Sequence, residues 1–85
     1  MDTIPTQSKL TYHMLGSRTL NQGCGGTDVQ ELQLGLIILG YKTPSDGFFE
    51  ARTELAVIKF QIANKLNADG IVDALTLKKL QSLLK

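Results

Sequence analysis

The chain has 85 residues, of which 42% are hydrophobic and 20% are charged, enough for one small folded core and unlike the composition of a disordered segment. Nine Lys and Arg residues against eight Asp and Glu residues leave a formal net charge of +1, which argues against a nucleic-acid-binding protein. A single cysteine, Cys24, excludes an intrachain disulfide and a multi-cysteine metal site, and no apolar run is long enough to insert into a membrane.

The N-terminal residues show no sustained hydrophobic period and are interrupted by Pro5, Ser8 and Gly16. We interpret residues 1–17 as a flexible or partly ordered segment, with a short extended piece near residues 18–20, and residues 18–85 as one domain. No continuous apolar stretch of the kind found in secretory signals is present. The only histidine, His13, has no carboxylates in a pattern around it, so we assign it no metal-binding or catalytic role.

The first predicted helix begins at Thr27, after the glycine-rich turn of residues 23–26. Thr27 and Gln30 have the spacing of a capping box, in which each side chain satisfies a backbone N–H of the first helical turn. Gly40 supplies a left-handed stop. The expected core stripe consists of Val29, Leu32, Leu36 and Leu39.

The second predicted helix runs from about Ala51 to Asn64, and the third follows Asp73, whose short carboxylate suits an N-cap. The β-branched pair of residues 71–72 predicts a short extended link before the third helix. The expected fold is therefore an all-α, small three-helix bundle with short irregular or extended links. Its predicted core residues are Ala56, Val57, Phe60 and Ala63 of the second helix, and Leu77, Leu80 and Leu84 of the third.

One eight-residue pattern occurs twice: residues 46–53 and 69–76 both begin with Asp-Gly, carry an acid and an Ala, and end with Thr, 23 residues apart. This regularity indicates one supersecondary unit used twice. Placing Gly47 or Gly70 at the sixth position of a calcium-binding loop puts lysines and threonines where carboxylates are required, so neither turn is a calcium site. No nucleophile–base pair or phosphate-binding motif is present either, so we predict a noncatalytic chain without metal or cofactor.

These motifs, taken in order, resemble the peptidoglycan-binding domain family, the three-helix modules attached to bacterial and phage cell-wall hydrolases. The resemblance covers about residues 18 to 84 and is carried by L-x-x-G-x-x-G-x-D-V-x-x-L-Q from Leu20, L-G-Y at residues 39–41, D-G-x-F at 46–49, T-E-x-A-V-x-x-F-Q at 53–61, D-G-I-V at 69–72 and T-L at 76–77. It implies a noncatalytic module that binds peptidoglycan and localises an attached or associated wall enzyme. It also implies an extracytoplasmic location, in the periplasm or cell wall, or delivery by a phage.

Most of the motif residues are expected to shape the fold rather than to contact a ligand. The amides of Gln33 and Gln61 are predicted to tie the Asp-Gly turns to the helices, and Thr53 and Thr76 to bond backbone near the helix starts. Glu50 and Asp73 stand where the family commonly has Gly, and Glu50 is a poor N-cap. The fold-defining set is Asp28, Gln33, Asp46, Gly47, Phe49, Thr53, Phe60, Gln61, Asp69, Gly70 and Thr76.

Two sets of surface residues are the functional candidates. The loops that join the helices offer hydrogen-bond donors and an aromatic face for a stem peptide or a glycan, through Tyr41, Lys42, Ser45, Arg52 and Asn67. A second, apolar set occupies positions that are often polar in the family: Leu34, Ile37, Leu55, Ile58 and Ile62.

The apolar set has two interpretations. It is covered by the N-terminal segment through Ile4, Leu10, Tyr12, Met14 or Leu15, which we favour together with a monomeric chain, or it is covered by another protein surface. The second interpretation gives an alternative function, a protein-interaction or prodomain-like module with the same fold.

Overall fold

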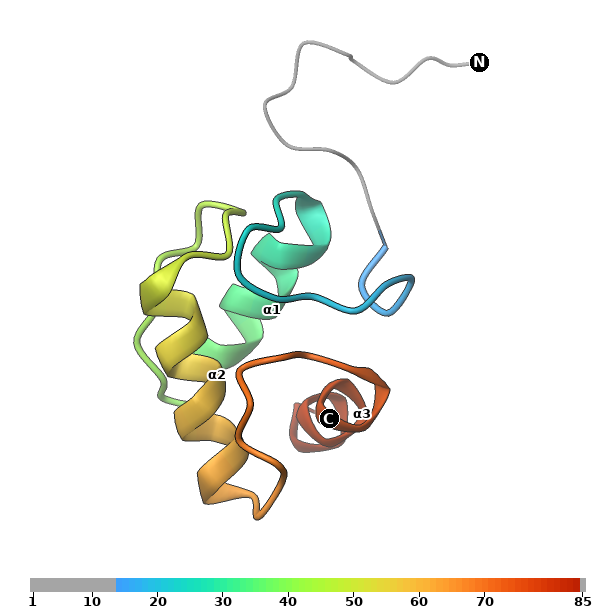
Figure 1. Ribbon diagram of the computed structural model, residues 1–85, viewed down its shortest axis with the longest axis vertical. Coiled ribbons are helices and arrows are strands. Elements are labelled where there is room, and N and C mark those ends of the chain that lie inside the picture. The colour runs from blue at the N-terminus through green and yellow to red at the C-terminus, as the bar shows by residue number, and fades with distance from the viewer. Residues whose placement is uncertain (1–13, 85) are drawn as a thin grey trace, which may run out of the picture.

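The computed structural model describes residues 14–84, which fold into three α-helices joined by irregular links (Figure 1). The helices are α1 (Thr27–Ile38), α2 (Ala51–Ala63) and α3 (Ala74–Leu83). Within residues 14–84 the β-type pairing is limited to two isolated antiparallel bridges, Leu20 with Val72 and Gly25 with Phe48. The predicted all-α class and the three predicted helices are confirmed.

The N-termini of the helices are capped differently. Asp73 accepts a hydrogen bond from the backbone N–H of Thr76, the predicted N-cap of α3. Glu50, at the N-cap of α2, makes no side-chain cap bond. The capping box predicted for α1 is wrong, because Gly26 is the N-cap and the Gln30 amide donates to the carbonyl of Ser45 instead of turning back on the helix start.

The C-termini of α1 and α2 end in the same way. At the end of α1, the N–H of Gly40 donates to the carbonyl of Ile37 and the N–H of Tyr41 donates to the carbonyl of Leu36. These are the two hydrogen bonds of a Schellman motif. At the end of α2, the N–H of Lys65 bonds the carbonyl of Ile62 and the N–H of Leu66 bonds the carbonyl of Gln61, which repeats both hydrogen bonds. Here, however, a lysine takes the left-handed conformation, with φ 60°. A Cβ in that conformation crowds the backbone, so the end of α2 is strained, whereas Gly40 lets α1 end without this strain.

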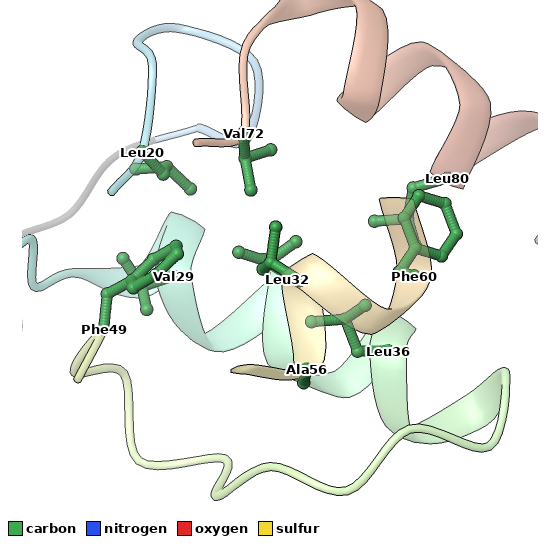
Figure 2. Packing of buried hydrophobic residues seen from close by; sticks show 10 residues of the cluster. Leu20, Val29, Leu32, Leu36, Phe49, Ala56, Phe60, Val72 and Leu80 are labelled. Atoms are coloured by element: carbon green, nitrogen blue, oxygen red, sulfur yellow. The ribbon is translucent and has the colours of Figure 1, made fainter. Parts of the chain in front are cut away.

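The hydrophobic core lies where the three helices meet (Figure 2) and includes two residues of the links, Phe49 and Val72. Two core predictions are wrong. Ala63 is exposed, although Phe60 and Gln61 of the same turn are buried, because it lies to one side of the buried face of α2. Leu84 is 37% exposed because it follows the last residue of α3, at the edge of the bundle. The fully or nearly fully buried apolar residues are Leu20, Val29, Leu32, Leu36, Phe49, Ala56, Val57, Phe60, Val72 and Leu80.

The segment before α1 holds the two Asp-Gly units together. Leu20 and Val72 exchange backbone hydrogen bonds of 3.1 and 2.7 Å. A few residues later, the N–H of Gly23 bonds the carbonyl of Phe49, whose own N–H bonds Cys24. Phe49 and Val72 occupy the same position in the two copies of the repeat, so one segment pairs with equivalent points of both units and fixes their relative position.

Candidate functional site

The first Asp-Gly turn is built around the buried side chain of Gln33, which projects from α1. Its Oε1 accepts a hydrogen bond of 2.8 Å from the N–H of Gly47. Its Nε2 donates to Thr53 Oγ1 at 2.9 Å, to the carbonyl of Phe48 at 3.0 Å and to Asp46 Oδ1 at 3.3 Å. One amide therefore joins α1, the turn and the start of α2.

The second turn repeats this arrangement around Gln61 of α2. The N–H of Gly70 donates to Gln61 Oε1 at 2.9 Å, and Nε2 donates to the carbonyl of Ile71 at 3.0 Å, to Thr76 Oγ1 at 3.1 Å and to Asp69 Oδ1 at 3.2 Å. Two features favour glycine at position 70. Its φ of 76° is one that residues with a side chain rarely adopt, and an added Cβ would lie 2.9 Å from a side-chain carbon of Glu54.

The two glutamines thus have the turn-tying role that their positions predicted, and they are not available to a ligand. Both are 0% exposed, and the hydrogen-bonding capacity of each amide is used inside the fold. The Asp46 carboxylate accepts the N–H of Phe48 as well as the Gln33 amide. The Phe48 hydrogen bond is the main cause that holds the pKa of Asp46 below its ordinary value. The repeated motif is therefore structural, and a ligand site has to be sought elsewhere.

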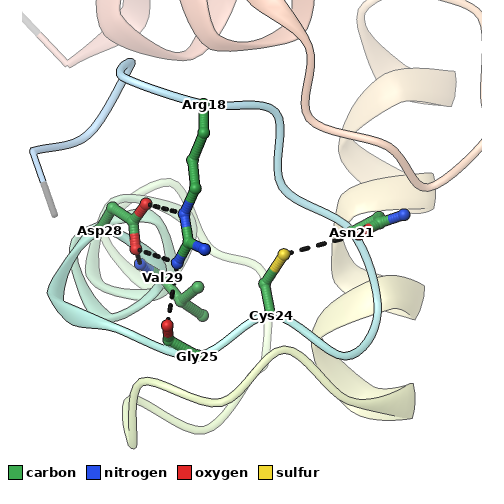
Figure 3. Close-up of polar contacts among 6 residues, drawn as sticks. All are labelled: Arg18, Asn21, Cys24, Gly25, Asp28 and Val29. Atoms are coloured by element: carbon green, nitrogen blue, oxygen red, sulfur yellow. Dashed lines mark hydrogen bonds and ion pairs between the residues drawn. The ribbon is translucent and has the colours of Figure 1, made fainter. Parts of the chain in front are cut away.

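An ion pair that the sequence did not predict closes the N-terminal end of the fold (Figure 3). Arg18 Nε and a second guanidinium nitrogen donate to the two carboxylate oxygens of Asp28 at 2.8 and 3.1 Å, and the guanidinium also bonds the carbonyl of Gly25. Asp28 is fully buried, whereas the Arg18 side chain is 32% exposed. The hydrogen bonds to Asp28 raise the pKa of Arg18 further. The backbone N–H of Val29 also donates to Asp28 Oδ1 at 2.8 Å, so the buried carboxylate is held by Arg18 and by the start of α1 together.

A hollow of about 500 Å³ lies between the link after α1 and one face of α2. Tyr41 and Lys42 line it from the link, and Arg52 and Lys59 line it from α2. The Tyr41 ring is held in place by an edge-on contact with Phe60 of the core, with ring centroids 5.8 Å apart and planes at 80°. The full lining is Gly40, Tyr41, Lys42, Arg52, Leu55, Ala56 and Lys59.

All the charged side chains that line the hollow are positive. Its lining contains three cationic side chains, Lys42, Arg52 and Lys59, and no carboxylate. Within residues 14–84 none of the three makes an ion pair with an acidic side chain. Arg52 also borders a second hollow of about 150 Å³, which Asp46 and Glu50 line, and it is close enough to act electrostatically on Asp46. A chain with a net charge of only +1 therefore concentrates positive charge at one place.

The five loop residues predicted to contact a ligand are only partly brought together. Tyr41, Lys42 and Arg52 share the hollow. Ser45 lies outside its lining and bonds Gln30 through its carbonyl. Asn67 lies in the link between α2 and α3, where its amide donates to the Asp69 carboxylate.

The sequence prediction missed Lys59. Its spacing of seven from Arg52, with Leu55 between them, places all three on one helical face, and this periodic signal could have found it.

The apolar surface set is largely exposed, as its positions indicated. Leu34, Ile37, Leu55 and Ile62 are 42–63% exposed, and Ile58 is half-buried. Of the residues predicted to cover it, Ile4, Leu10 and Tyr12 lie outside the described residues. Leu15 packs instead against the core, and Met14 is 68% exposed.

Residues 14–84 contain no cluster of His, Cys, Asp and Glu that could hold a metal ion. None of the three helices in this part of the chain has the length and apolarity needed to cross a membrane.

Comparison with known proteins places this fold and sequence in context. Residues 25–80 match the family model described as "Putative peptidoglycan binding domain". Among curated proteins, none matches. Among solved structures, the SleB N-terminal domain superposes with a TM-score of 0.80 at 33% identity, over 85% of this chain and 100% of that domain.

Larger proteins contain a similar domain. A peptidoglycan-binding protein of Clostridioides difficile matches with a TM-score of 0.74 and 35% identity, over 76% of this chain and 41% of its own length. The endolysin of the Burkholderia phage AP3 matches with a TM-score of 0.73 and 38% identity, over 75% of this chain and 25% of its own. This chain therefore spans less than half of either protein.

Proposed function

Because this chain belongs to the peptidoglycan-binding domain family, we propose that it binds peptidoglycan and thereby localises a wall-active enzyme to which it is attached or with which it associates. The domain is a noncatalytic module, and related domains occur in cell-wall hydrolases and endolysins. Peptidoglycan-binding domains act at the cell wall, so the chain works outside the cytoplasm or reaches the wall through a phage.

The observation that carries the proposal is the hollow at Tyr41, Lys42, Arg52 and Lys59. It combines an aromatic ring held by the core, three cationic donors that make no ion pair within residues 14–84 and an apolar floor, while the amides of Gln33 and Gln61 in the turns are used inside the fold. A volume of about 500 Å³ falls within the range of roughly 300–1,000 Å³ that ligand sites occupy. Because the wall is an immobile polymer, even a dissociation constant of about 1 mM raises the effective concentration of a tethered enzyme at its substrate.

Sedimentation with purified sacculi tests this function. We expect the chain to sediment with the sacculi, and we expect Arg52→Ala and Tyr41→Ala to remain more in the supernatant. Lys79→Ala is the matched control, since it also removes an exposed cation from a helix but lies outside the hollow. Retention of the wild-type chain in the supernatant would contradict the function. Equal sedimentation of all four proteins would contradict the placement of the site at the hollow.

A second candidate function is protein interaction with the accompanying enzyme through the exposed apolar set. The observation that favours it is the exposure of Leu34, Ile37 and Ile62 on α1 and α2. Leu34→Gln combined with Ile37→Gln distinguishes the two functions. If wall binding is the function, this variant sediments with sacculi like the wild type; if the apolar set is the functional surface, it loses association with the enzyme domain in a two-component sedimentation experiment.

A further inference from the structure

Three cationic side chains line the hollow beside Tyr41, so the charged parts of the wall polymer are its natural candidate ligands. Peptidoglycan consists of N-acetylated sugars without charge and of short peptides that carry free carboxylates. We propose that the hollow binds the carboxylate-bearing peptide stem rather than the glycan strand, an inference that rests on the proposed function and identifies the ligand chemistry of the same site.

The geometry of the three cations fits a carboxylate-bearing ligand. Arg52 and Lys59 project from one face of α2, and Lys42 comes from the link after α1, so positive charge reaches the hollow from two elements. A carboxylate placed there accepts charge-assisted hydrogen bonds and neutralises positive charge, whereas a neutral sugar offers the same donors only neutral oxygen acceptors.

The floor of the hollow fits the rest of a peptide stem. Leu55 is 52% exposed and Ala56 is buried beside it, so the surface between the cations is aliphatic. Such a surface suits the methyl groups of the alanine residues that occur in stem peptides. The lining contains no amide and no carboxylate side chain to accept hydrogen bonds from sugar hydroxyl groups, and Tyr41 is its one side chain with an acceptor oxygen.

Titration of the isotopically labelled chain by NMR tests the inference with four probes. They are the tetrapeptide L-Ala-γ-D-Glu-L-Lys-D-Ala with free carboxylates, the same peptide with its carboxyl groups amidated, chitotetraose and glycerol phosphate. We expect the free-acid peptide to shift the backbone amides of residues 41–42 and 52–59. The amidated peptide is expected to bind about tenfold more weakly, and chitotetraose is expected to leave these amides unshifted.

Charge-neutralising variants test which side chains act. Arg52→Gln, Lys42→Gln and Lys59→Gln are each expected to weaken binding of the free-acid peptide about three- to tenfold, because each removes one charge from a solvent-accessible cluster. Lys79→Gln makes the same change in net charge outside the hollow and is expected to leave the affinity unchanged. Circular dichroism of each variant establishes that the helices are retained.

The outcomes separate the inference from the function on which it rests. Equal affinity for the free-acid and amidated peptides, or shifts with chitotetraose alone, would overturn the peptide assignment. Binding of glycerol phosphate as tight as that of the free-acid peptide would assign the hollow to phosphate polymers and also overturn it. If the wild-type chain sediments with sacculi while the free-acid peptide does not bind, the inference fails and the proposed function stands; if it does not sediment, both fail.

Discussion

The substitution Gln61→Leu probes the glutamine network that sets the second turn. Leucine keeps a similar side-chain volume but removes all four hydrogen bonds that Gln61 makes to Gly70, Ile71, Thr76 and Asp69. The N–H of Gly70, which is buried, then has no side-chain acceptor in the fold, and the buried Thr76 hydroxyl loses a donor.

The magnitude follows from what is left unpaired. A buried polar group without a partner costs about 1–3 kcal/mol, and the exposed Asp69 adds little because water replaces its lost bond. Two such groups, the Gly70 N–H and the Thr76 hydroxyl, give a loss of about 2–6 kcal/mol, a large part of the total stability of about 4–13 kcal/mol expected for a domain of this size. At about 4–8 °C for each kcal/mol, the melting temperature falls by at least about 8 °C.

Urea denaturation and thermal unfolding, followed by far-ultraviolet circular dichroism, measure the loss. Gln81→Leu is the matched control, because Gln81 lies on the exposed side of α3, and it is expected to change the free energy of unfolding by less than about 0.5 kcal/mol. Gln33→Leu is expected to cost as much as Gln61→Leu, since Gln33 makes the equivalent four bonds. A loss below about 1 kcal/mol for Gln61→Leu would refute the conclusion that these amides hold the turns.

Three further changes test other parts of the fold. Arg18→Ala is expected to lower the free energy of unfolding by about 3 kcal/mol in urea denaturation, since it removes the two hydrogen bonds of the ion pair to the buried Asp28 carboxylate; an unchanged midpoint would contradict this. Lys65→Gly is expected to raise the free energy of unfolding by about 0.5–1 kcal/mol, because it relieves the strain of a left-handed residue at φ 60°. A lower free energy of unfolding would show that the lysine side chain stabilises the fold by more than this strain destabilises it. Folding depresses the pKa of Asp46, so its contribution is complete above the unfolded pKa of about 3.9 and is lost as the pH falls through the folded value. Asp46→Asn should therefore show a shallower loss of stability than the wild type below about pH 4, and parallel acid-unfolding curves would contradict the assignment.

The sequence predicted the three helices because each one carries strong local signals. An apolar stripe, a glycine stop after α1 and the Asp73 cap act within a few residues of one another, so the chain itself records them. The equivalence of the two turns was also visible, because the repeat places Asp, Gly and Thr at the same spacing. The Gln30 error shows the limit of this reasoning: a capping-box spacing is local, but its amide found the Ser45 carbonyl across a link.

Features that depend on long-range geometry were not predictable in the same way. The pairing of Arg18 with Asp28 crosses a glycine-rich turn that has no periodic pattern. Ser45 and Asn67 have the right chemistry for a ligand, but they lie outside the lining of the hollow. Lys59 lines it because the link after α1 lies beside that face of α2. The sequence shows hydrogen-bond donors in several links, but which of them line the same hollow depends on the fold.

A binding isotherm with purified sacculi tests the central claim most directly. The wild-type chain is titrated against a fixed amount of sacculi at about 20 mM and at about 500 mM salt, and the sedimented fraction is measured. We expect saturable binding that weakens at the higher salt concentration, because the cations of the hollow are solvent-accessible and screened. Sedimentation that does not saturate, or no sedimentation at either salt concentration, would contradict a specific wall-binding function.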